Sequence, residues 1–147
     1  MVLYTAETAE VVASYDIVSS PALEVVVSYP LASITISGGA TQTAGDSNVL
    51  TITATMSDSS GYTGNLDITF SGADAIGGNT PTVTDLNGIP VAFGTPTTIT
   101  FVDGTATAGG SMVLYAAQTA QVVATNSGGA SSSALEVTVS PLSLIHI

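Results

Sequence analysis

Apolar and polar residues alternate along several short segments of this chain. In VLTITATM (residues 49–56) every second residue is apolar and would face inward from an extended strand: Leu50, Ile52, Ala54 and Met56. The same period of two recurs in NLDITF, TTITF and ALEVTVS, at 65–70, 97–101 and 134–140. This alternation predicts antiparallel strands with one buried side and one solvent-facing side.

Turn-forming segments rich in Gly, Ser, Asn and Asp separate these strands. The segment TVTDLNGIPVAF (82–93) predicts a hairpin about Asn87 and Gly88. Pro90 places that arm at a sheet edge, because proline has no N–H for an interior ladder. Seven or eight short strands in about 110 residues predict an all-β fold, an immunoglobulin-like antiparallel β-sandwich. Without Cys or Trp its core would be aliphatic, with four larger side chains: Phe70, Phe101, Tyr62 and Tyr115.

Two segments near the start of the chain return near its end. MVLYTAETAEVVAS (1–14) matches MVLYAAQTAQVVAT (112–125) at ten of fourteen positions, and ALEVVVS (22–28) matches ALEVTVS (134–140) at six of seven. The offset of 111 or 112 residues is too long for a solenoid repeat and fits a whole small domain. Glu7 and Glu10 become Gln118 and Gln121 in the second copy, an exchange that favours exposed positions.

The repeat predicts where the domains lie. Residues 1–28 are expected to be the C-terminal fragment of a preceding repeat, and 29–141 a complete immunoglobulin-like repeat. Met1 aligns with Met112, so we expect the chain to begin inside a domain. Leu142–Ile147 (LSLIHI) equals the translation of a common transposon-end sequencing adapter, which gives His146 no role; the alternative is a diverged strand.

The charge of the chain limits the kinds of molecule that it could bind. The 147 residues include 11 Asp and Glu but no Lys, Arg or Cys, giving a net charge of −11. A chain without cationic side chains cannot neutralise phosphates, so nucleic acid and anionic membrane surfaces are disfavoured. No apolar run is long enough for a transmembrane helix, and no disulfide or thiolate metal site can form.

The quoted segments resemble the tandem bacterial immunoglobulin-like (Big-type) repeats of long secreted or surface-attached proteins, including adhesin stalks. The segments that carry the resemblance are GYTGNLDITFSGA, TPTVTDLNGIPVAFGTPTTITFVDGTATA, MVLYAAQTAQVVAT and SSALEVTVSP. The resemblance implies a β-sandwich repeat and no catalytic residues. It leaves the parent protein open, because such repeats occur in proteins of many activities.

Catalytic motifs are missing from the sequence. The segments around Ser47 and Ser111 lack the second glycine of a nucleophile elbow, and a phosphate loop would need a lysine. Asp67 and Glu136 fall at solvent-facing strand positions, which favours a solubilising role over a catalytic one. Calcium is the one metal for which ligands could be named, all of them in or beside turns: Asp58, Asp74, Asp85 and Asp103. Turn-forming aspartates that bind local backbone groups are the alternative.

We therefore predict a non-catalytic structural and adhesive spacer of an extracellular or cell-surface protein, with no cofactor. Its partners would be the neighbouring repeats of the same chain. Self-association through the N-terminal fragment is expected as well, because Leu23, Val25 and Val27 would expose an apolar face. The alternative is a carbohydrate-binding accessory module beside a secreted enzyme, which would need an exposed aromatic platform.

Overall fold

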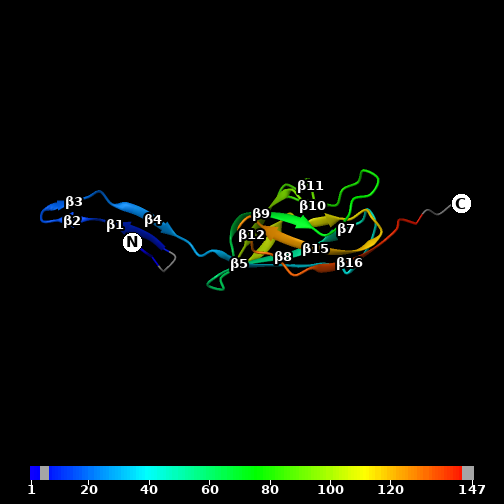
Figure 1. Cartoon of the computed structure of the whole chain (residues 1–147), viewed down its shortest axis with the longest axis horizontal. Coiled ribbons are helices and arrows are strands. Elements are labelled where there is room, and N and C mark those ends of the chain that lie inside the picture. Colours follow the sequence, from blue (N-terminus) through cyan, green and yellow to red (C-terminus); the bar gives the residue numbers. More distant parts are fainter. Residues whose placement is uncertain (4–6, 144–147) are drawn as a thin grey trace. The chain divides into compact units, whose positions relative to one another are not determined.

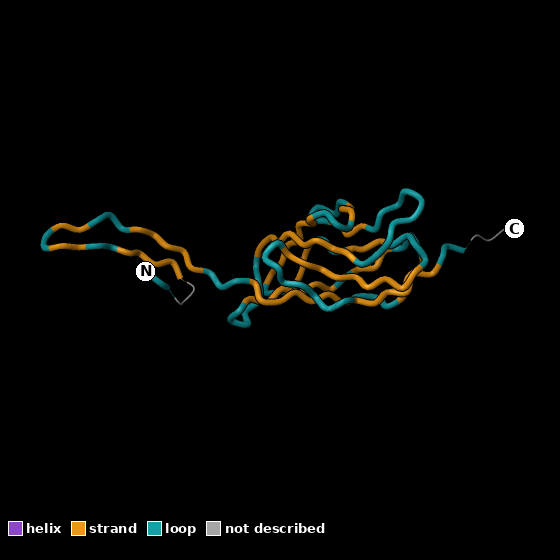
Figure 2. Tube along the Cα trace, in the orientation of Figure 1, coloured by secondary structure: helices purple, strands orange, loops and turns teal. Residues whose placement is uncertain are grey.

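The computed structural model describes residues 1–3 and 7–143 of the chain. Their secondary structure is 57% strand without helix, so the predicted all-β class is confirmed (Figures 1 and 2). Contacts divide the chain into two units, Met1–Pro30 and Leu31–Ile147. We refer to them as unit 1 and unit 2. The interpretation of Leu142–Ile147 falls mostly on residues 144–147, which lie outside the described residues.

Unit 1 is a β-hairpin. Its strand β1 (Glu7–Val11) pairs with β4 (Leu23–Val27), and β2 (Ser14–Tyr15) pairs with β3 (Val18–Ser19) nearer the tip. Between the two pairs, the Ala13 N–H donates to Ser20 Oγ at 3.0 Å and the Ser20 N–H donates to the Ala13 carbonyl at 2.8 Å. This serine clasp joins the two short ladders into one hairpin.

Unit 2 contains the remaining strands, β5 to β16. They are β5 (Leu31–Ser37), β6 (Thr41–Thr43), β7 (Ser47–Val49), β8 (Thr51–Met56), β9 (Gly64–Ser71), β10 (Thr82–Thr84), β11 (Pro90–Ala92), β12 (Pro96–Val102), β13 (Thr105–Ala108), β14 (Ser111–Val113), β15 (Gln118–Asn126) and β16 (Leu135–Ser140). Eight of them form one sheet, in the order β5-β8-β13-β12-β9-β15-β16-β6. Four form a second sheet, in the order β11-β10-β14-β7.

The strands are shorter and more numerous than the sequence pattern predicted. The expected strand 49–56 is divided at Leu50, and the facing strand is divided at Gly109 and Gly110. At this point the Leu50 N–H donates to the Gly110 carbonyl at 2.9 Å. One continuous ladder therefore bends, so that β8 and β13 belong to the large sheet while β7 and β14 belong to the small one.

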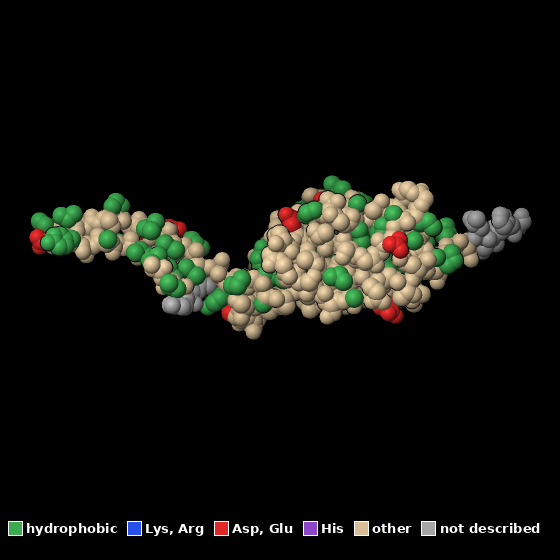
Figure 3. Space-filling view, viewed as in Figure 1, with side chains coloured by type: hydrophobic (Ala, Val, Ile, Leu, Met, Phe, Trp, Pro, Cys, Tyr) green, Lys and Arg blue, Asp and Glu red, His purple; other side chains and the backbone are tan. Residues whose placement is uncertain are grey.

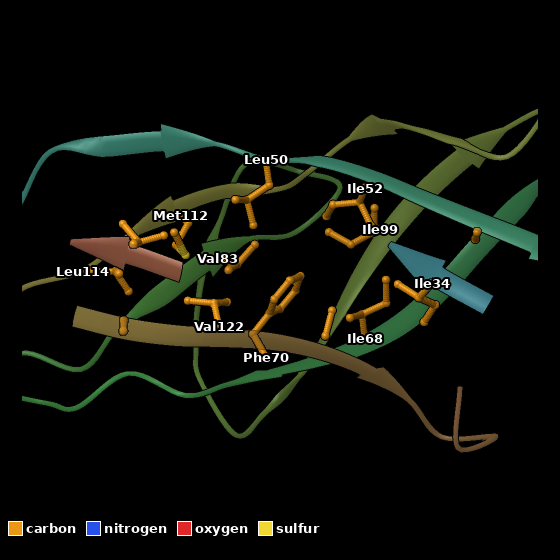
Figure 4. Packing of buried hydrophobic residues seen from close by; sticks show 14 of the residues in the cluster. Ile34, Leu50, Ile52, Ile68, Phe70, Val83, Ile99, Met112, Leu114 and Val122 are labelled. Carbon is orange, nitrogen blue, oxygen red and sulfur yellow. The ribbon is translucent and has the colours of Figure 1, made fainter. Parts of the chain in front are cut away.

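Side chains from both sheets meet in one aliphatic core, as Figure 4 shows. The alternation in 49–56 is confirmed for Leu50, Ile52 and Ala54, which are 5%, 1% and 0% exposed, whereas Met56 at the strand end is half-buried. The other predicted strands bury Ile68, Phe70, Ile99, Phe101, Val137 and Val139. Period-two patterning therefore located most of the core.

Two pairs of aromatic rings belong to this core or pack against it. Tyr62 lies edge-on against the buried Phe101, with ring centroids 6.1 Å apart and planes at 77°. Phe70 packs against Phe93, a ring that the sequence analysis did not single out. Tyr115, expected in the core, is only half-buried.

The hairpin predicted about Asn87 and Gly88 is confirmed. β10 pairs with β11 so that Val83 faces Val91 and Thr84 faces Pro90. Gly88 has a φ of +78°, which explains why glycine occupies the turn. β11 is the outermost strand of the small sheet, as expected for a strand that begins with proline.

Hydroxyl pairs occupy the solvent-facing side of neighbouring strands. Thr35 and Thr53 lie opposite each other on β5 and β8, with their Oγ1 atoms 2.6 Å apart. On β12, Thr98 Oγ1 donates to Asp67 Oδ1 at 2.6 Å, and Thr100 Oγ1 donates to Asn65 Oδ1 at 2.8 Å. Asp67 is exposed, as predicted. Cross-strand pairs of this kind stabilise a sheet without ion pairs.

The core predicts a large difference between two neighbours on β12. Replacing Phe101, which is 0% exposed, by alanine removes its contact with Tyr62 and should lower the free energy of unfolding by about 3–5 kcal/mol. The control is Val102→Ala, at a residue 48% exposed, which should change it by no more than about 0.5 kcal/mol. Urea denaturation of both variants measures the difference, and equal losses would contradict the proposed core.

Candidate functional site

The four aspartates that could have bound calcium lie in four separate places. Asp58 follows β8, Asp74 follows β9, Asp85 lies between β10 and β11, and Asp103 lies between β12 and β13. Among residues 1–3 and 7–143, no three His, Cys, Asp or Glu side chains come close enough to hold a metal ion together. On the face seen in Figure 3, acidic side chains lie at separate points.

Asp58 binds the residues of its own turn. Its Oδ1 accepts hydrogen bonds from the Ser60 hydroxyl at 2.5 Å and from the Ser60 N–H at 3.0 Å. These two bonds favour the charged carboxylate, the hydroxyl more than the backbone, and they lower the pKa of Asp58 below its ordinary 3.8. The carboxylate is therefore occupied in shaping the turn.

The Asp85 carboxylate also binds local backbone groups, whereas Asp103 takes part in its turn through its own backbone. Asp85 Oδ1 accepts from the N–H groups of Asn87 and Ile89, at 2.8 and 2.9 Å, and so orders the β10–β11 turn. Asp103 has a positive φ of 47°, and its N–H donates to Thr63 Oγ1 at 3.0 Å. Aspartate tolerates this backbone region better than most residues do, which explains why an aspartate occupies this position of a tight turn.

Asp74 faces the start of β15. With the Gln118 amide oriented to satisfy both groups, its oxygen accepts from the Asp74 N–H at 3.0 Å and its nitrogen donates to Asp74 Oδ2 at 3.3 Å. Gln118 is half-buried, whereas the sequence exchange had predicted an exposed position. Gln121 is exposed as predicted, and its Nε2 donates to Glu136 Oε2 at 2.8 Å. Both glutamines therefore donate to a carboxylate.

One depression of about 390 Å³ opens between β5 and the segment that leads into β16. Residues 33–36 form one wall, and Ser131, Ser133 and residues 134–136 form the other. Its polar groups are hydroxyls and the exposed Glu136 carboxylate, and it is lined by neither an aromatic ring nor an imidazole. This depression offers neither a nucleophile–base pair nor a stacking platform.

An exposed aromatic group lies instead at the tip of unit 1. Tyr15 is 87% exposed, and next to it Ile17 and Val18 are 94% and 68% exposed. The sequence carried a signal for this apolar tip, because residues 15–21 (YDIVSSP) are where the two copies of the repeat differ most. Unit 2 has NSGGASSS there, a polar segment.

Comparisons of the chain with protein-family models, with curated proteins and with solved structures find no match. The described residues include no helix of the length and apolarity needed to cross a membrane.

The Asp58 turn gives a test by titration. Ser60→Ala removes the hydroxyl that contributes most to the shift, so the pKa of Asp58 should rise towards 3.8. Because the folded pKa is lowered, these bonds stabilise the turn at neutral pH, and the contribution disappears as the pH falls through the folded value. NMR titration of the carboxyl carbon measures this shift. Ser57→Ala is the control and should leave the titration curve unchanged.

The separation of the aspartates predicts an equal melting temperature in calcium and in chelator. A specific site at 100-fold saturation would stabilise the fold by about 2.7 kcal/mol. For a domain of this size that corresponds to a rise of about 10–20 °C. Calorimetry at matched ionic strength distinguishes the two cases, and a rise of that size would show a site that the turns do not reveal.

Proposed function

We propose that this chain is a non-catalytic structural and adhesive spacer, part of a row of immunoglobulin-like repeats in a long extracellular or cell-surface protein. The observation that carries the proposal is the match between the hairpin of unit 1 and the β15–β16 hairpin of unit 2. The match extends from sequence to strand register and to individual hydrogen bonds. It supports two copies of one kind of domain following each other along the chain.

The strand registers of the two hairpins are equivalent. In unit 1, Ala9 faces Val25 and Glu10 faces Glu24. In unit 2, Ala120 faces Val137 and Gln121 faces Glu136. Each residue pair in one hairpin is thus the sequence counterpart of a pair in the other.

The serine clasp is repeated as well. In unit 2 the Ala124 N–H donates to Ser132 Oγ at 3.0 Å and the Ser132 N–H donates to the Ala124 carbonyl at 2.8 Å. The counterparts in unit 1, Ala13 and Ser20, have the same two distances. Two hairpins that differ in length by one residue at the tip keep the same internal bonds, which supports a common ancestral domain.

The strand pairings of unit 2 support an immunoglobulin-like topology. In this proposal the series β5-β8-β13, with β14 paired to β10, would correspond to the A-B-E-D sheet of such domains. The series β9-β15-β16 would correspond to the C-F-G sheet. β12 is an addition to this pattern, because it pairs with both β9 and β13 and links the two series.

The surface and the linker also support a spacer. Only Ser28, Tyr29 and Pro30 separate β4 from β5, and proline restricts the backbone of that segment. The chain has no Lys or Arg, so it offers no trypsin-type cleavage site outside the cell. A binding module is the second candidate because of the exposed Tyr15, although a single ring makes a small platform.

The spacer role predicts that length grows with the number of repeats. Two and three joined copies of 29–140 should behave as a rod in small-angle scattering, with a maximum dimension that increases almost linearly. The physical reason is the three-residue linker, which restricts independent tumbling. The control carries a long Gly/Ser segment between copies and should grow more slowly with copy number. Square-root growth without that insertion would contradict the spacer, and binding on a glycan array would favour the recognition module.

A further inference from the structure

The depression between β5 and β16 lies between two strand edges. β5 is the end strand of the eight-stranded sheet, where it pairs with β8. β16 pairs with β6 from Thr138 onwards, so Leu135 and Glu136 have β15 on one side and the depression on the other. The depression therefore takes the place that a further strand would occupy between β16 and β5.

The backbone of β5 directs polar groups into this depression. Ile34 lies opposite Ala54 on β8. The Ala54 N–H donates to the Gly104 carbonyl at 2.9 Å, and the Ala54 carbonyl accepts from the Tyr62 N–H at 3.0 Å, so both groups are used away from β5. Opposite residues of an antiparallel pair exchange both backbone hydrogen bonds or neither, and the two kinds of pair alternate. The N–H and carbonyl groups of Ile34 and Ile36 therefore point to the free edge.

The backbone of β16 does the same from the other wall. Gln121 lies opposite Glu136, but its N–H donates to the Gly72 carbonyl at 3.1 Å, away from β16. Two residues further along β16, the Thr138 N–H donates to the Ala40 carbonyl at 2.8 Å, just before β6. The N–H and carbonyl of Glu136 point to that same edge, ahead of the place where β6 begins to pair. Both walls thus present backbone groups that no strand of the described residues pairs with.

We propose that an extended peptide of another protein, with alternating apolar and cationic side chains, binds as a strand between β5 and β16. Six antiparallel pairings separate β5 from β16 in the sheet, so the two strands run in the same direction. One peptide can therefore pair with both walls in the same sense. The inference stands apart from the spacer role, because it rests on these two walls of unit 2 alone.

The side chains at the depression specify the peptide. Ile34 is 2% exposed and Leu135 is half-buried, so peptide side chains that point inward meet apolar groups. Glu136 is exposed, and Ser33 and Thr35 on the opposite wall are exposed as well. The Glu136 carboxylate accepts from Gln121 through Oε2, and its Oε1 can accept from a peptide cation. Alternate peptide residues should therefore be apolar and cationic.

The charge of the chain indicates that the peptide comes from another protein. A second copy carries the same net charge of −11 and has no Lys or Arg to place beside Glu136, so two copies repel each other. The edge of β5 itself is open to pairing, because its sequence LASITIS includes neither a charged residue nor proline. Its register shift lies between Leu31 and Ser33, ahead of Ile34.

Amide hydrogen exchange in the full-length chain tests where the peptide binds. The probe is the acetylated and amidated peptide Lys-Val-Lys-Val-Lys-Val-Lys. At saturation it should slow exchange at Ile34, Ile36 and Glu136 about tenfold or more, because each N–H gains a hydrogen bond. Ala92 on β11, an end strand of the small sheet, is the control and should keep its rate. Unchanged exchange at the three amides with about 1 mM peptide, or equal slowing at Ala92, would overturn the proposal.

Peptide variants separate strand insertion from attraction by charge alone. A peptide of the same composition, with its lysines in one block and its valines in another, should bind about tenfold or more weakly in calorimetry, because it cannot place apolar and cationic groups on opposite sides. Alternate N–H groups of a strand point to opposite sides. Methylation of either alternate set of peptide nitrogens should therefore weaken binding about tenfold or more. Equal binding of the block peptide, or loss with only one methylated set, would overturn insertion between the strands.

Two variants of the chain test the carboxylate. Glu136→Gln should weaken binding of the alternating peptide about 2-fold to 5-fold, the range expected for an exposed ion pair. Asp67→Asn removes the same charge from an exposed residue of β9, outside the lining of the depression, and should leave binding unchanged. Urea denaturation checks that both variants are folded. Equal weakening by the two substitutions would show attraction to net charge and would overturn the proposed site.

Discussion

The pairing of β15 with β9 is the interaction on which unit 2 depends. β9 pairs with β12 along one edge and with β15 along the other, so it joins the C-terminal hairpin to the rest of the unit. The two backbones come very close at Gly72, where the Gln121 N–H donates to the Gly72 carbonyl at 3.1 Å. A Cβ at Gly72 would lie 1.8 Å from the Gln121 carbonyl oxygen, and its φ is +95°. Only glycine fits there, so this contact between β9 and β15 depends on the close approach of the two backbones.

Period-two alternation predicted the core of unit 2 well, because a strand with one buried side repeats its burial every second residue. Leu50, Ile52, Ile99 and Phe101 all lie where the pattern placed them. The bend at Leu50 was not visible in the sequence, since it arises from the distant Gly110.

Other features also depended on residues far apart in the chain. The parallel pairing of β6 with β16 places Thr41 opposite Thr138. A strand of three residues is too short for its sequence pattern to predict this pairing. For the aspartates, the sequence predicted their location but not their hydrogen-bond partners. Their place in turns followed from composition, but which backbone groups Asp58 and Asp85 would bind required the folded turn. The role of Gln118 depended on Asp74 and was outside the reach of sequence comparison between copies.

Comparison of the two hairpins shows which of their features depend on local sequence and which depend on packing against other strands. Register and the serine clasp are the same in both, so they follow from the sequence of the hairpin itself. Burial differs: Ser132 is 8% exposed in unit 2, whereas Ser20 is exposed in unit 1. A two-stranded hairpin alone is marginally stable in water, so the covering layer supplies most of the free energy.

The hydroxyl pairs on the strand faces have a consequence for the medium in which this domain would be stable. Thr35 with Thr53 and Thr100 with Asn65 are neutral contacts, and the chain has no Lys or Arg with which a carboxylate could form an ion pair. Dissolved salt screens attraction between opposite charges, but here there is only repulsion among 11 acidic side chains to screen. Rising ionic strength therefore weakens the repulsion, and there is no ion pair with Lys or Arg for it to weaken. Such a surface suits brine or seawater as readily as fresh water.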